Sequence, residues 1–255
     1  MKKMAVVAVL ALGLVLMSIP AFATPVSEFS TVANGWTMLA DDDGVGNNGF
    51  VDPGWGGQDF DAEYLFYKYN DSTKMLSIGL QTGFDVDTGK QGNYYAGDLA
   101  LSFDGCKTYW EYGVDFGYTE QNGYSGASVG ALANGTGLYK VTEWNNDVYF
   151  HVADPFAIKS GSIIDDDVAS GGHFSTVAGR ETVSGDLSYW RTVSFSVAGI
   201  SGFTVDNVDA HWTMSCGNDV IESCSPVPEP QTLLLMGIGL LGLAFVGRKK
   251  LGERA

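Results

Sequence analysis

Acidic and amide side chains gather in one Gly-rich stretch, residues 41–61, where their oxygen atoms could bind a metal ion. Ca²⁺ takes about six to eight oxygen ligands, and loops supply backbone carbonyls besides carboxylates. The spacing differs from that of an EF-hand, because Val45 stands fifth in a loop that starts at Asp41 and no Glu stands twelfth. We therefore expect a calcium site of another kind, with these candidate ligands: Asp41, Asp43, Asn47, Asp59 and Asp61.

Two further acidic segments, 85–89 and 165–167, are alternative calcium positions. The competing interpretation is that all of these loops carry solvated charge without an ion. The whole chain has 30 acidic and 14 basic side chains among its 255 residues, for a formal charge of −16. Such a charge argues against nucleic acid as a partner, since binding nucleic acid needs a basic surface.

Aromatic side chains in turn-like sequence are a second candidate for chemistry. Sugar rings stack on exposed aromatic faces that lie beside polar groups. Three such residues stand in Gly- and Asn-rich sequence and are the candidate glycan contacts: Trp55, Tyr95 and Trp144. The alternative is that they pack over the ends of the fold. Trp36, Trp110 and Trp212 follow strand patterns and are expected in the core.

No residue pattern typical of catalysis stands out. Glycosidases need two carboxylates at a set separation, and no spacing among the 30 acids singles out such a pair. The three histidines are too scattered in sequence for a zinc cluster. We expect no catalytic residues, and His211, which stands beside Trp212 in a strand pattern, is predicted to be structural.

The three cysteines allow one disulfide bond in an oxidising compartment. Cys216 and Cys224 are eight positions apart around a Gly-Asn-Asp turn and are the predicted pair. Cys106 would then be a free thiol in a hairpin turn. A bond from Cys106 to Cys216 or to Cys224 is the alternative, because sequence does not decide the connectivity.

The elements that must position these residues are β-strands. Short runs with period-2 alternation are separated by Gly, Asn and Asp about every ten residues, and no sustained helical pattern intervenes. This pattern predicts one all-β domain, a β-sandwich or a jelly-roll-like fold. The predicted strands are 62–70, 74–82, 98–104, 108–116, 137–143, 148–153, 189–198 and 208–214. Residues 122–137 and 160–185, rich in Gly and Ser, are predicted to be long loops.

The N-terminus has the pattern of a secretory signal peptide. Two lysines precede an apolar run, residues 5–16, and Ala21 and Ala23 form a small-x-small cleavage site. Cleavage after Ala23 would leave Thr24 as the first residue of the exported protein. The apolar run is short for a membrane span of about 20 residues, which favours a cleaved signal over an anchor.

The C-terminus carries a second apolar segment, residues 233–246, which a basic cluster follows. Basic residues after such a segment stay on the cytoplasmic side, so the body of the chain would lie outside the cytoplasmic membrane. A Val-Pro-Glu-Pro stretch, the apolar segment and the Arg-Lys-Lys tail together resemble the PEP-CTERM sorting signal. The residues of this resemblance are Val227, Pro228, Glu229, Pro230, Arg248, Lys249 and Lys250.

This resemblance implies several expectations. The partner that processes the chain would be exosortase, a membrane-embedded transpeptidase-like enzyme of Gram-negative bacteria that make extracellular polysaccharide. The tail would contact the membrane transiently and be cut near Pro228-Glu229-Pro230. The predicted organisation is a signal peptide (1–23), an exported β-sandwich domain (24–222), a linker with the Pro-Glu-Pro motif (223–231) and a transmembrane sorting segment with a basic tail (232–255).

Parts of the body also resemble exosortase-dependent surface proteins of uncharacterised function, over 57–69, 76–83, 97–104, 111–114 and 211–220. A more distant similarity is to β-sandwich carbohydrate-binding modules of the family 9 type. Residues 24–231 hold eight basic and 29 acidic side chains, a formal charge of −21. We therefore expect a non-catalytic structural or interaction protein of the cell surface or biofilm matrix, associated with exopolysaccharide. The alternatives are a carbohydrate-binding module with structural Ca²⁺ and, more remotely, a glycan-active enzyme.

Overall fold

The computed structural model describes residues 24–30, 34–42, 56–86, 94–108, 110–116, 136–146, 148, 150–166 and 172–224. The chain divides into two compact units, Met1–Ser223 and Cys224–Ala255. The fold below is that of the first unit. Over the described ranges, no helix is both long enough and apolar enough to cross a membrane.

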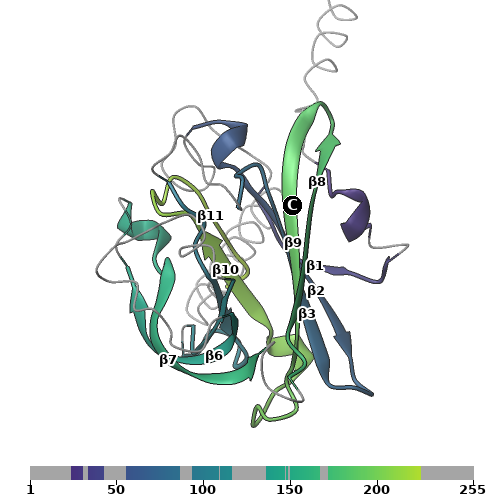
Figure 1. Cartoon of the computed structure of the whole chain (residues 1–255), viewed down its shortest axis with the longest axis vertical. Helices are drawn as coiled ribbons and strands as arrows, with labels where there is room; N and C mark the ends of the chain where they lie inside the picture. The colour runs from purple at the N-terminus through teal and green to yellow at the C-terminus, as the bar shows by residue number, and fades with distance from the viewer. Residues whose placement is uncertain are drawn as a thin grey trace, which may run out of the picture. The chain divides into compact units, whose positions relative to one another are not determined.

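The described residues of the first unit form two antiparallel sheets, which confirms the prediction of an all-β fold (Figure 1). The five-stranded sheet has the order β1 (Thr37–Asp41), β2 (Ala62–Asn70), β3 (Met75–Thr82), β9 (Asp186–Ser196) and β8 (Ser175–Val183). The six-stranded sheet has the order β11 (Val220–Glu222), β10 (Asp209–Thr213), β4 (Leu99–Ser102), β5 (Tyr112–Asp115), β6 (Gly137–Asn145) and β7 (Ala157–Asp166). Short 3-10 helices are η1 (Ser27–Phe29), η2 (Gln58–Phe60), η3 (His151–Ala153) and η4 (Val205–Asn207).

One apolar core joins the two sheets. Leu65, Ile78 and Phe195 project into it from the five-stranded sheet, and Leu101 and Trp212 from the six-stranded sheet. All five side chains are 1% exposed or less. The indole N–H of Trp212 donates to the Gly97 carbonyl at 3.0 Å, so its one polar atom is satisfied inside the core.

The N-terminal segment covers the outer face of the five-stranded sheet. Phe29 in η1 is fully buried, and its ring stacks on Phe66 of β2 at 4.6 Å between centroids. Trp36 meets Phe29 edge-on at 5.3 Å. Gly79 of β3 makes room for this packing, since a Cβ there would lie 2.3 Å from Cε1 of Phe29. Both faces of β2 are therefore covered, which explains the unbroken burial from Ala62 to Phe66.

Several predicted strands are confirmed. The hairpin of β2 and β3 turns where it was predicted, and the Asn70 side chain accepts hydrogen bonds from the backbone N–H groups of Ser72 and Thr73 at 3.0 and 3.2 Å. Such a side-chain cap is typical of Asn in tight turns. Strands β4, β5, β9 and β10 lie within or close to the predicted ranges.

Two predictions of local structure are wrong. Residues 148–153 do not pair with β6; they include the 3-10 helix η3, and β7 pairs with β6 instead. The predicted loop at 160–185 holds much of β7 and all of β8. Strand β8 is half-exposed or exposed at every position, so it has no apolar alternation, and its pairing with β9 comes from backbone hydrogen bonds.

Candidate functional site

The candidate calcium ligands fall partly outside the described residues. Asp43 and Asn47 are in that part of the chain. Asp41 ends β1, Asp59 lies exposed in η2, and Asp61 follows η2 and is 1% exposed. Among the described residues these three carboxylates do not form a group of ligand atoms within 4.8 Å of one another. The calcium prediction therefore stays a prediction.

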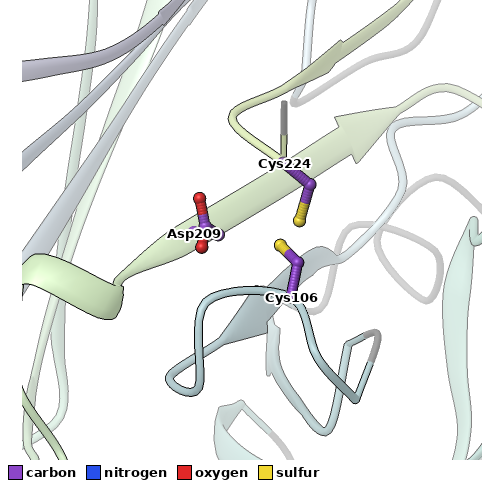
Figure 2. A group of neighbouring side chains, drawn as sticks. All are labelled: Cys106, Asp209 and Cys224. Atoms are coloured by element: carbon purple, nitrogen blue, oxygen red, sulfur yellow. The ribbon is translucent and has the colours of Figure 1, made fainter. Parts of the chain in front are cut away.

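The cysteines pair differently from the prediction. Cys106 and Cys224 are disulfide-bonded, and Cys216 is the free thiol, so the predicted Cys216–Cys224 bond is wrong and the alternative to Cys224 is right. Figure 2 shows the sulfur atoms of Cys106 and Cys224 directed toward each other, with Asp209 beside them. These three side chains place their ligand atoms within 4.8 Å, but oxidised sulfurs are not the thiolates that bind metal ions.

Cys106 lies in a tight turn and Cys216 lies in the core. Gly105 and Cys106 both have positive φ, +72° and +57°, in the turn that follows β4. Cys216 lies at the end of the core and is 3% exposed, where burial raises the pKa of its thiol to about 11. The cysteine nearest to Cys224 in the sequence is thus a buried residue of the core, and the bond joins Cys224 to the distant Cys106.

The candidate glycan aromatics have structural contacts where they are described. Trp144 on β6 donates its indole N–H to the Trp110 carbonyl at 2.8 Å, and a Cβ on Gly113 would lie 2.6 Å from its ring. Tyr95 is half-buried, and its backbone N–H bonds to the Ser215 hydroxyl at 3.0 Å. Trp55 lies outside the described residues.

His211 has the contacts expected of a structural histidine. It is 1% exposed, and its ring lies 5.2 Å from the ring of Trp110. Its Nε2 lies 3.0 Å from the Pro155 carbonyl, and its Nδ1 lies 3.3 Å from a carboxylate oxygen of Glu222. Both ring nitrogens therefore face an oxygen acceptor.

Among the described acidic residues Glu63 has the lowest exposure, 0%, and no pattern in the sequence pointed to it. Its carboxylate accepts hydrogen bonds from Gln81 at 2.5 Å, Gln58 at 2.7 Å and Ser188 at 2.8 Å, and the residue is fully buried. Burial raises the pKa of Glu63, and the three hydrogen bonds counteract that rise in part. Gln81 also accepts from the Val26 N–H at 2.8 Å, so this network ties the N-terminal segment to the sheet.

The raised pKa of Glu63 predicts a pH dependence. A carboxyl whose folded-state pKa lies above the unfolded value contributes most to stability at low pH, and that contribution is lost as pH rises through the folded pKa. Glu63→Gln lacks this titration. Its stability relative to the wild type should therefore increase as pH rises from about 4.5.

Paired urea titrations of both proteins across pH 4–8 measure this difference. The exposed Glu143→Gln substitution, which removes one surface carboxylate, is the control. A Glu63→Gln difference that stays flat or falls with pH would contradict the raised pKa.

The first unit has a pocket of about 470 Å³. It lies between the loop from β4 to β5 and the loop from β9 to β10. Phe103 and Tyr112 form an aromatic wall, with ring centroids 4.9 Å apart. The polar lining includes Lys107, Lys140 and Glu111.

Asp104 holds the first of these loops in place. Its carboxylate accepts hydrogen bonds from the backbone N–H groups of Lys107 at 2.8 Å and Thr108 at 3.1 Å. Burial acts to raise the pKa of Asp104, but these bonds and one from Ser102 outweigh it and lower the pKa. Asp104 is therefore a structural carboxylate at the pocket rim.

The comparisons with known proteins concern the C-terminal end. Residues 226–250 match the family described as the PEP-CTERM protein-sorting motif. The chain carries a PEP-CTERM sorting signal. The predicted resemblance to PEP-CTERM proteins is thus confirmed over these residues, and the motif indicates exosortase-dependent sorting of an exported protein. No curated protein and no solved structure matches the chain.

The individual residues of the PEP-CTERM signal lie outside the described part of the structure. This holds for the motif residues Val227, Pro228, Glu229 and Pro230, and for the basic residues Arg248, Lys249 and Lys250. It holds also for Ala21 and Ala23 of the predicted signal-peptide cleavage site. Cys224, the last described residue, lies two positions before the first residue of the matched motif.

Proposed function

We propose that this PEP-CTERM protein is a non-catalytic structural or interaction component of the surface or extracellular matrix of a Gram-negative bacterium, where it associates with exopolysaccharide. The observation that carries the proposal is the sorting motif at residues 226–250. In this proposal exosortase removes the C-terminal segment, and the exported part is a single β-sandwich domain. The strongly acidic body, −21 over residues 24–231, binds matrix polymers through divalent cations.

Processing of the tail tests the sorting part of the proposal. In a host that has exosortase, intact-mass measurement of the wild-type protein should show a species without residues 233–255. Substitution of Pro228, Glu229 and Pro230 together by Ala should leave the full tail on the protein and keep it in the membrane fraction. Glu253→Gln, which lies beyond the matched residues, is the control and should be processed normally. Removal of the tail from the triple variant would overturn the proposal.

Association with matrix tests the second part. The processed protein should sediment with the exopolysaccharide of its host and should release no soluble sugars from it. Loss of co-sedimentation on adding a chelator would support cation bridges. Failure to co-sediment under any condition, or release of reducing sugars, would contradict the proposed role.

Structural calcium is a separate part of the proposal, with Asp41, Asp43, Asn47, Asp59 and Asp61 as the candidate ligands. An ion that binds only the folded state stabilises it by about 2.7 kcal/mol at a concentration 100 times its Kd. The melting temperature should therefore fall when EDTA is added and recover when Ca²⁺ is restored.

The variant Asp59→Asn with Asp61→Asn should show a smaller response to EDTA than the wild type. The matched variant Asp206→Asn, at an exposed residue of η4, should respond as the wild type does. A melting temperature that is the same with and without EDTA would exclude a structural calcium ion.

The second candidate function is a carbohydrate-binding module. The pocket with its Phe103 and Tyr112 wall favours it, because sugar sites combine an aromatic face with a few convergent polar groups. This candidate needs no cation bridge, so the two functions differ in their response to a chelator.

A further inference from the structure

We propose that the pocket between the loops 103–111 and 200–207 binds a sugar residue that carries a carboxylate, such as a uronic acid within a polysaccharide. The inference deepens the proposed function, on which it rests, by naming the site and the chemical class of the glycan. It replaces the sequence-predicted aromatics by a different set of residues. Five residues of the pocket lining do the recognition: Lys107, Lys140, Glu111, Tyr112 and Asn207.

The two lysines are the first reason. The described part of the chain contains five lysines, and three of these have a partner there. Lys74 pairs with Asp71, Lys159 pairs with Glu143, and Lys68 donates to the Asn34 carbonyl. Within the same described residues, the ammonium groups of Lys107 and Lys140 pair with no carboxylate, and both line the pocket. Two carboxylates, Asp104 and Glu111, line the same pocket, but Asp104 accepts the backbone N–H groups of Lys107 and Thr108, and Glu111 accepts that of Phe103. The two ammonium groups have no such partner and are therefore the charges that remain for an anionic ligand.

The aromatic wall is the second reason. Tyr112 at the start of β5 stands directly opposite Lys140 of β6 in the sheet register, so the ring and the ammonium group come from neighbouring strands. Phe103 is 4% exposed and supports Tyr112 from behind. Phe203 meets Phe103 edge-on at 5.4 Å and extends this support to the second loop. A rigid ring beside charged groups suits the apolar C–H face of a sugar.

Glu111 is the third reason. One oxygen of its carboxylate accepts the Phe103 N–H at 2.9 Å. The other is buried and has no hydrogen-bond partner among the described residues. A buried carboxylate oxygen without a partner is costly, and a hydroxyl donor of a ligand would satisfy it once the Glu111 side chain turns this oxygen toward the pocket that it lines. A simple anion has no such donor, whereas a sugar has several.

These groups together select the ligand class. A carboxylate of the ligand would pair with the ammonium groups of the two lysines. Its hydroxyl groups would form hydrogen bonds with Glu111 and the Asn207 side chain, and its ring face would stack on Tyr112. The pocket volume of about 470 Å³ lies within the usual range for small-ligand sites, about 300–1,000 Å³. A neutral sugar would leave both lysines without an ion-pair partner, and an inorganic anion would leave the second Glu111 oxygen without a hydrogen-bond donor.

Binding to defined oligosaccharides tests the inference. The processed full-length domain, prepared from a host with exosortase, is titrated with oligomers of galacturonate, of glucuronate-containing hyaluronan and of alginate, and with neutral dextran oligomers. EDTA is present throughout, so that cation bridges cannot contribute. We expect at least one uronate oligomer to bind at least about tenfold more tightly than dextran. Raising the salt from about 0.1 M to about 1 M, which shortens the screening length from about 10 Å to about 3 Å, should weaken that binding.

Three variants separate recognition from general attraction. Lys107→Gln with Lys140→Gln should lower the affinity for the uronate oligomer at least about tenfold. The matched pair Lys68→Gln with Lys159→Gln, which makes the same charge change away from the pocket lining, should lower it less than about twofold. Glu111→Gln removes a negative charge yet should weaken binding: its one amide oxygen accepts the Phe103 N–H, and a donating NH₂ group replaces the oxygen that would accept a hydroxyl. Circular dichroism melts confirm that each variant is folded.

The outcomes distinguish the inference from the function on which it rests. If no uronate oligomer binds in EDTA, or both lysine pairs behave alike, the pocket inference is wrong, while co-sedimentation with exopolysaccharide in Ca²⁺ can still hold. If Glu111→Gln strengthens binding, the site attracts anions only and the sugar assignment is wrong. If the protein neither co-sediments nor binds any oligomer, the proposed function and the inference fall together.

Discussion

Phe29→Ala should lower the free energy of unfolding by about 3–5 kcal/mol, the usual cost of truncating a buried Phe. The ring is fully buried between Phe66, Trp36 and Trp190, with centroid distances of 4.6, 5.3 and 6.1 Å. Truncation removes apolar contacts and leaves a cavity over the outer face of the five-stranded sheet. Leu187→Ala, at a side chain that is 40% exposed, is the control and should cost less than about 1 kcal/mol.

A double-mutant cycle with Gly79 checks the mechanism. Gly79→Ala alone should be destabilising by about 1–3 kcal/mol, because its Cβ would lie 2.3 Å from Cε1 of Phe29. In the Phe29→Ala background the same change should cost clearly less, since the clashing atom is gone. Urea unfolding followed by tryptophan fluorescence measures all four proteins. Additive effects would show that Phe29 does not pack on Gly79.

Loss of the Cys106–Cys224 bond should lower the free energy of unfolding by about 2–4 kcal/mol. The two residues are 118 positions apart in the sequence, and a bond across so long a segment restricts the unfolded chain strongly. The variant Cys106→Ser with Cys224→Ser provides the measurement. Cys216→Ala is the matched control, since it removes the free thiol and leaves the bond intact.

Thiol labelling supplies an independent check of the same connectivity. The folded oxidised protein should react slowly with iodoacetamide, because Cys216 is buried and its thiol pKa is about 11. After unfolding without reductant, one cysteine should react, and peptide mapping should place the label on Cys216. A label on Cys106 would show that the bond runs between Cys216 and Cys224 instead.

Alternation in the sequence predicted the strands that line the shared core. In β9, Val193 and Phe195 are buried on the inner face while their neighbours are half-exposed. Such alternating burial requires alternating apolar residues, and a strand can be predicted from that pattern. Strand β8 has no such pattern because it lies at the edge of its sheet and is exposed along much of its length. Its position depends on pairing with β9, and the sequence of β8 alone does not predict that pairing.

The candidate pocket could not be found from the sequence for a related reason. Glu111, Lys140 and Asn207 are far apart along the chain, and each alone resembles an ordinary polar residue at the end of a strand. Only the fold brings them together. The sorting signal is the opposite case, since all of its parts lie within residues 226–250 and their order is itself the signal.

The position of Cys224 near the C-terminal end of the described residues bears on when the Cys106–Cys224 bond can form. Cys224 follows β11, and the N-terminal signal peptide predicted from the sequence would bring β1 through β11 out of the cytoplasm before Cys224. Thiols stay reduced in the cytoplasm and pair in the oxidising space outside it. This prediction implies that the Cys106–Cys224 bond forms only after export, close in sequence to the sorting motif that begins at residue 226.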